Sequence, residues 1–165
     1  PPPYLASMPD PSSSTHMTML SFYSFPPSGV ADVPDFALRL KRLWAPFNAL
    51  GRVYVAPEGV NAQMSVPSDV LSNFRECCLS VPELGEWMEN GLNVDPVPVP
   101  VQEFWKEGKV PFKGLHIRER RQIVADALDG PLDWQRAGTD LPPLEWHERL
   151  AKAEGGGGGG GADPP

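Results

Sequence analysis

The spacing of apolar residues along this chain changes from a strand pattern to a helix pattern and back, and it does so twice. This alternation constrains the fold more than any other feature of the sequence. Residues 17–25 are rich in apolar and aromatic side chains and are followed by two prolines, which predicts a buried strand. Apolar side chains then recur at helical spacing, at Phe36, Leu40, Leu43, Phe47 and Leu50. We expect Asp32 to cap this helix and Pro46 to kink or end it near Ala45.

The second repeat of the pattern begins with two short segments of alternating polarity. Residues 52–56 and 60–66 are joined by the turn signal Pro57-Glu58-Gly59, so together they predict a β-hairpin. Ser68 is the expected cap of a second helix, and Pro82 is expected to end it. The apolar stripe of that helix consists of Val70, Phe74, Cys77 and Val81.

Two segments near the end of the pattern are candidates for further strands. Residues 94–100 alternate valine with proline, which is typical of an edge strand or an extended polyproline segment. Residues 112–124 are the expected last strand, with Leu115 and Ile117 facing the core. The resulting order β-α-β-β-α-β predicts an α+β, ferredoxin-like sandwich, in which two helices cover one face of a four-stranded antiparallel sheet.

The composition of the two ends differs from that of the middle. The chain has 21 prolines and 16 glycines, and many of them lie near the termini, so we expect both ends to be disordered. The predicted organisation is a proline- and serine-rich leader (1–16), a ferredoxin-like domain (17–126), a linker with a short helix (127–154) and a glycine-rich tail (155–165).

A local basic strip contrasts with the overall charge of −7, which argues against nucleic-acid binding by the whole surface. Residues 106–121 hold six lysines and arginines against two acids, whereas residues 126–165 hold three bases against eight acids. Phe104, Trp105 and Phe112 lie nearby and could stack bases. The strip predicts weak RNA contact, with a solvated basic edge as the open alternative. Its candidate contacts are Lys106, Lys109, Lys113, His116, Arg118, Arg120 and Arg121.

The sequence offers no catalytic or metal-binding constellation. Cys77 and Cys78 are adjacent and therefore unsuited to bridging each other, which indicates a reducing compartment. They lie on a predicted amphipathic helix beside Glu76, so we expect core thiols rather than nucleophiles. The three histidines are scattered, and no apolar run reaches the length of a membrane span. We therefore expect no catalytic residue, metal or cofactor in this chain, and no membrane partner.

Three segments resemble a known family when they are taken in order. Residues 20–25 (LSFYSF) and 51–61 (GRVYVAPEGVN) are similar to the first domain of the rhodanese-containing tRNA uridine hydroxylases. Residues 111–124 resemble the last strand of that acylphosphatase-like, ferredoxin-like domain, and residues 141–148 (LPPLEWHE) resemble the linker helix that leads to the rhodanese domain. The family-motif turn comprises Arg52, Glu58, Gly59 and Asn61.

The resemblance implies an accessory domain that helps to position tRNA while a rhodanese domain, expected after residue 150, hydroxylates the wobble uridine. Residues 155–161 are glycines instead, so we expect this chain to be inactive alone, and whether it is an enzyme stays open. Possible partners are tRNA, a rhodanese domain or another protein. The alternatives are a protein-interaction module and a truncated sulfurtransferase-family fragment. The implied compartment is the cytoplasm, with a plastid or mitochondrion as the alternative.

We expect structural roles for two residues of the family-motif turn, and we expect no acylphosphatase activity from the fold. Gly59 should supply a positive φ, and Asn61 should bond the backbone of its own loop. Acylphosphatase chemistry needs a loop of free backbone amides beside an arginine. Residues 25–29 contain two prolines and no arginine, so we do not predict that activity.

Overall fold

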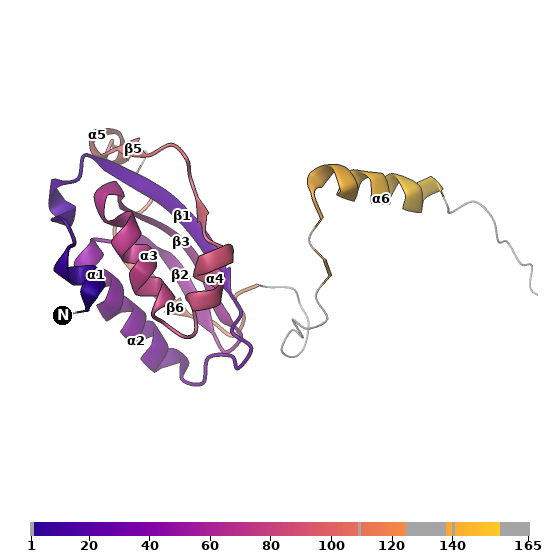
Figure 1. Ribbon diagram of the computed structural model, residues 1–165, viewed down its shortest axis with the longest axis horizontal. Coiled ribbons are helices and arrows are strands. Elements are labelled where there is room, and N and C mark those ends of the chain that lie inside the picture. The colour runs from indigo at the N-terminus through magenta and orange to yellow at the C-terminus, as the bar shows by residue number, and fades with distance from the viewer. Residues whose placement is uncertain (1, 109, 125–137, 140, 156–165) are drawn as a thin grey trace, which may run out of the picture. The chain divides into compact units, whose positions relative to one another are not determined.

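The computed structural model describes residues 2–108, 110–124, 138–139 and 141–155 (Figure 1). The chain divides into two compact units, residues 1–132 and residues 133–165. The described residues of the second unit include the helix α6 (Pro143–Gly155), on the predicted linker. The greater part of the expected glycine-rich tail, residues 156–165, lies outside the described residues.

Three long antiparallel strands form the centre of the sheet in the first unit. They are β1 (His16–Ser24), β2 (Leu50–Ala56) and β3 (Gly59–Pro67), with β3 in the middle. Two-residue strands β4 (Asn93–Val94) and β5 (Val99–Pro100) pair antiparallel with the outer edge of β1. On the opposite edge, β6 (Leu115–Glu119) pairs with β2 in parallel.

The α+β, ferredoxin-like fold class is confirmed, but the strand count differs from the prediction. The sheet has six strands rather than four, and one of its pairings is parallel. The valine-proline segment, as β4 and β5, takes the edge beside β1. Its ladders are only two residues long, because proline cannot donate a backbone hydrogen bond. The predicted last strand is shorter than expected and lies on the other edge, although Leu115 and Ile117 do pack against the core.

Two helices lie over the same face of the sheet (Figure 1). The first, α2 (Val33–Trp44), begins where the Asp32 carboxylate accepts a hydrogen bond from the backbone N–H of Asp35 at 2.9 Å, as predicted. A short 3₁₀ turn, η2 (Ala45–Phe47), follows and contains Pro46. Leu50 opens β2 instead of continuing the helical stripe, because the chain has already left the helix at Pro46.

The second predicted helix is α3 (Leu71–Leu79), which follows the 3₁₀ turn η3 (Ser68–Val70). Ser68 is not the cap of α3. It is the first residue of the 3₁₀ turn that precedes this helix, and its hydroxyl lies 2.8 Å from the Thr18 hydroxyl of β1. Two shorter helices, α4 (Gly85–Asn90) and α5 (Val101–Phe104), come later in the chain.

One hydrophobic core joins the helices to the inner face of the sheet. It contains the whole predicted second stripe, with Cys77 completely buried. Of the predicted first stripe, Phe36, Leu40 and Phe47 are buried in it and Leu43 packs against it, whereas Leu50 does not belong to it. Trp44, which the helical stripe did not include, is also fully buried and lies edge-on to Phe22. The largest members are Phe22, Phe36, Leu40, Trp44, Phe47, Val53, Val55, Met64, Phe74, Leu84 and Met88.

The leader, for which composition predicts disorder, includes two short elements and contacts the core. It contains a short helix, α1 (Pro3–Ala6), and a 3₁₀ turn, η1 (Pro11–Ser13). Tyr4 stacks on Phe47 at a centroid distance of 6.3 Å, and its carbonyl accepts a hydrogen bond from the Asn73 side chain at 2.8 Å. Three apolar residues among the prolines pack against the core, namely Tyr4, Leu5 and Met8.

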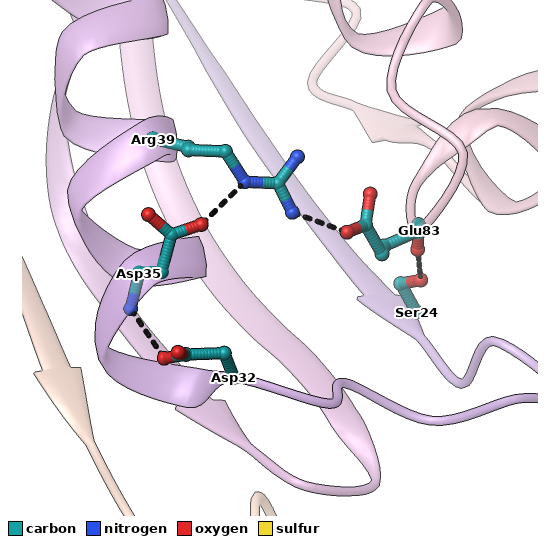
Figure 2. Close-up of polar contacts among 5 residues, drawn as sticks. All are labelled: Ser24, Asp32, Asp35, Arg39 and Glu83. Atoms are coloured by element: carbon teal, nitrogen blue, oxygen red, sulfur yellow. Dashed lines mark hydrogen bonds and ion pairs between the residues drawn. The ribbon is translucent and has the colours of Figure 1, made fainter.

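A polar cluster ties α2 to the segment between α3 and α4 and to the end of β1 (Figure 2). Arg39 forms ion pairs with Asp35, at 3.2 Å, and with the Glu83 carboxylate. The backbone carbonyl of Glu83 accepts a hydrogen bond from the buried hydroxyl of Ser24. This cluster fixes the last residue of β1 relative to the helical layer.

None of the helices in the described part of the chain is both long and apolar enough to cross a membrane.

Candidate functional site

The sheet face opposite α2 and α3 carries polar, basic and aromatic side chains. Successive side chains of a strand point to opposite faces. In β2, Val53 and Val55 are buried toward the helices, so Arg52 and Tyr54 project the other way. We call this second surface the open face.

Cross-strand pairing places two rows of side chains on the open face, because directly paired residues point to the same side. The first row is Tyr23, Asn61, Tyr54 and Arg118, from β1, β3, β2 and β6 in turn. The second row is Ser21, Gln63, Arg52 and His116 in the same strand order. Neither row contains an acidic residue, although the chain has a net charge of −7.

The rows occupy the middle of the open face, and both ends of this face are buried. At one end Met17, Ser65 and Pro67 are buried. At the other end Phe25, Ala56 and Ile123 form a small second core cluster, against which Tyr54 packs. Between these ends, Arg52, Gln63, His116 and Arg118 are exposed.

The aromatic side chains of the first row are held in defined orientations. Tyr23 is 46% exposed, and its ring stacks on Phe25 at a centroid distance of 6.0 Å and an interplanar angle of 3°. Phe25 in turn packs edge-on against Trp87. The Arg120 guanidinium lies 4.9 Å from the centre of the Tyr54 ring, within range of a cation–π interaction.

The residues of the family-motif turn have different places in the structure. Gly59 has a φ of +149°, and an added Cβ would lie 1.8 Å from the carbonyl oxygen of Ser24. One oxygen of the Glu58 carboxylate accepts a hydrogen bond from the backbone N–H of Ile123 at 2.6 Å. Asn61 lies within β3 on the open face and not in the turn itself, which differs from its expected loop role because β3 already begins at Gly59.

The structure separates the residues of the predicted basic strip. His116 and Arg118 belong to the rows, and Arg120 joins them through its contact with Tyr54. Arg121 lines an open cleft with Val33, Pro57, Glu119 and Gln122, and Arg120 lines this cleft as well. Lys106 and Lys113 are exposed on the connection between α5 and β6, and Lys106 forms an ion pair with Glu103 at 3.7 Å. Lys109 lies outside the described residues.

The two cysteines are buried in the core. Desolvation by burial raises the pKa of both thiols, although Cys78 Sγ accepts a hydrogen bond from Trp44 Nε1 at 3.3 Å. A thiol with a raised pKa carries little of the thiolate that acts as a nucleophile or metal ligand. Among the residues that the structure describes, no group of three histidine, cysteine or acidic side chains could hold a metal ion.

Several positions in the loop after β1 offer no free amide to a phosphate group. The backbone N–H of Gly29 donates to the Pro26 carbonyl at 2.8 Å, and that of Val30 donates to the Pro57 carbonyl at 2.7 Å. Since Pro26 and Pro27 have no N–H, four of the positions in this loop cannot contribute to an anion cradle.

Sequence reasoning missed the aromatic and amide members of the rows. Tyr23, Tyr54 and Gln63 alternate with buried residues along predicted strands, which is a detectable signal. The register that aligns them across four strands is not visible in any single strand. The sequence points to Arg52 and Asn61 only through the family-motif turn, and the structure brings them beside the basic strip.

The sequence of this chain is similar to a described protein family and to several known proteins. Residues 17–123 match the family described as the UPF0176 acylphosphatase like domain. The tRNA uridine(34) hydroxylase of Escherichia coli O81 (strain ED1a) is 32% identical over 134 residues, which cover 81% of this chain and 35% of that protein. The proteins of the same name from Escherichia coli K12 and Shigella flexneri serotype 5b (strain 8401) are 31% identical over the same shares. The match thus spans about a third of the length of these relatives.

Proposed function

The chain belongs to the UPF0176 acylphosphatase like domain family, and we propose that it is a tRNA-contacting accessory domain in wobble-uridine modification. In this proposal the domain positions tRNA and is not catalytic alone. The relatives are named for action on uridine 34, and this chain matches about a third of each. Its two thiols are buried, which is consistent with a binding role rather than nucleophilic chemistry.

The observation that carries the proposal is the positive charge of the open face. Arg52 and Arg118 are exposed in neighbouring rows, next to His116 and Arg120, and the rows contain no acid. Arginine side chains bind phosphate and release condensed counterions, so this face would attract an RNA backbone despite the overall negative charge. Its few cations predict weak binding, with a dissociation constant of roughly 10⁻⁴ to 10⁻⁶ M at physiological salt.

A salt titration of labelled tRNA against the 165-residue chain tests this proposal. The Arg52→Gln/Arg118→Gln variant should bind more weakly, and its salt slope should fall by about 0.7–0.9 for each phosphate that the protein no longer neutralises. The matched control is Lys41→Gln/Arg42→Gln, which removes the same charge from exposed positions on α2. Equal slopes for the two variants would contradict a phosphate-binding role for the open face.

A second candidate function, docking to a protein partner, is favoured by α6. This helix exposes large apolar side chains, with Leu144 73%, Trp146 54% and Leu150 42% exposed. Apolar side chains on one exposed helix are typical of a surface that binds another protein. Binding of a partner that is abolished by Trp146→Ala but insensitive to salt would support this function, whereas the first proposal requires strong salt dependence.

A further inference from the structure

We propose that the first row of the open face binds unpaired nucleotides, so that the domain takes single-stranded RNA in preference to an RNA duplex. This inference rests on the proposed function and adds the class of RNA. It assigns base stacking to Tyr23 and to the Arg120–Tyr54 pair, and contact with a base edge to Asn61.

The Tyr23 ring is suited to stacking because it is both exposed and fixed. It is 46% exposed, and Phe25 supports it through nearly parallel stacking. The next residue, Ser24, is anchored through its hydroxyl to the Glu83 carbonyl, and Glu83 is itself paired with Arg39 (Figure 2). A ring that is already ordered loses little side-chain entropy when a base stacks on it.

A second stacking surface lies two strands away in the same row. Tyr54 packs against the small core cluster, and the exposed Arg120 places its guanidinium over the Tyr54 ring. RNA bases stack on arginine guanidinium planes as well as on aromatic rings. Because neighbouring strands are about 4.8 Å apart, Tyr23 and Tyr54 are separated by about 10 Å across the sheet.

Asn61 lies between these two surfaces on β3. It pairs with Tyr23 on one side and with Tyr54 on the other. Its side-chain amide has two N–H donors and a carbonyl acceptor, which can match the Watson–Crick edge of a base that has left the stack. Arg118 lies at the end of the row, where it can neutralise a phosphate of the bound RNA strand.

These features favour single strands for a physical reason. In an A-form duplex the base faces are covered by their neighbours, and proteins reach mainly phosphates and 2′-hydroxyls. A duplex would use the arginines but leave Tyr23 and Asn61 without base contacts. An unpaired segment offers base faces and edges in addition to the same phosphate charge.

The test compares a short uridine oligoribonucleotide with a blunt RNA duplex of the same length, by anisotropy titration against the full chain. Tyr23→Leu keeps apolar bulk but removes the ring, so it should weaken single-strand binding by about fivefold to 150-fold, the effect of losing one stacked base. Duplex binding should change less than about twofold. Tyr23→Phe should retain single-strand binding, which separates loss of stacking from loss of the hydroxyl.

A matched control is Trp105→Leu, because Trp105 is 47% exposed but lies outside the rows. Single-strand binding that depends on Trp105 and not on Tyr23 would overturn the inference. Equal affinity of wild type for both RNAs, with a salt slope that still depends on Arg52 and Arg118, would also overturn it while leaving the proposed function intact. No binding of either RNA or of tRNA would refute the proposed function together with the inference.

Discussion

Replacing Gly59 with alanine should destabilise the domain more than any other single-methyl addition at a positive-φ glycine. Gly59 starts β3 and has a φ of +149°, a conformation that alanine rarely adopts. An added Cβ would lie 1.8 Å from the carbonyl oxygen of Ser24. Real Cβ contacts essentially never fall below 3.0 Å. The backbones of β1 and β3 would therefore have to move apart by about 1.2 Å at this point.

The expected loss combines backbone strain with weakened strand pairing. A residue forced into this region of φ costs about 1–3 kcal/mol. Separation at Gly59 would also disturb the last paired residues of β1 and β3, Ser24 and Val60, where each broken hydrogen bond removes about 0.5–1.5 kcal/mol. Together these effects predict a fall of about 3–5 kcal/mol in the free energy of unfolding, a large share of the stability of an ordinary domain.

Gly108→Ala is the matched control because it isolates the effect of φ. Gly108 has a φ of +78°, but no heavy atom lies within 4 Å of an added Cβ. It should therefore lose only about 1–2 kcal/mol. Urea unfolding of both variants, followed by tryptophan fluorescence and extrapolated linearly to water, gives the two losses. Equal losses would refute the reasoning, since they would show that the close approach to Ser24 has no energetic effect.

Two further predictions concern the core. Leu40→Ala should lower the free energy of unfolding by about 2–5 kcal/mol in the same assay, because Leu40 is 1% exposed. The control is Leu38→Ala, which should change it by less than about 0.5 kcal/mol because Leu38 is 46% exposed. A loss at Leu40 as small as at Leu38 would show that this stripe is not core. Burial raises the pKa of the Cys77 and Cys78 thiols, so the folded state keeps their protons while the unfolded state releases them above about pH 8.5. The free energy of unfolding should therefore fall between about pH 8 and pH 10, and fall less in Cys77→Ala/Cys78→Ala. Identical pH dependence of the two proteins would contradict the assignment.

Local patterns in the sequence predict the local elements well. The cap at Asp32, the end of the helix near Pro46 and the hairpin at residues 57–58 all depend on neighbouring residues and appear as expected. Most buried residues of α2 and α3 also follow from helical spacing, although Trp44 lies outside the predicted stripe and Leu50 belongs to β2.

Features that depend on distant pairing are not predictable in the same way. The sequence of β6 indicates a strand, but nothing in residues 115–119 specifies β2 as its partner or parallel as its direction. The contacts between the leader and the core are not visible in its composition, because prolines and serines dominate the leader whereas the contacts are made by Tyr4, Leu5 and Met8. The rows of the open face likewise require the register of four strands at once.

The parallel pairing of β6 with β2 affects the order in which the domain assembles. The β2–β3 hairpin closes over a two-residue turn, whereas β6 is separated from β2 along the chain by β3, α3, α4, β4, β5 and α5. Closing a long loop costs more entropy than closing a short one, so we expect β6 to dock late and to detach first. The amide protons of β6 should then exchange with solvent through a local unfolding event that costs less free energy than the event that exposes those of β3. His116 and Arg118 would leave the open face with β6, which makes this face complete only in the fully folded domain.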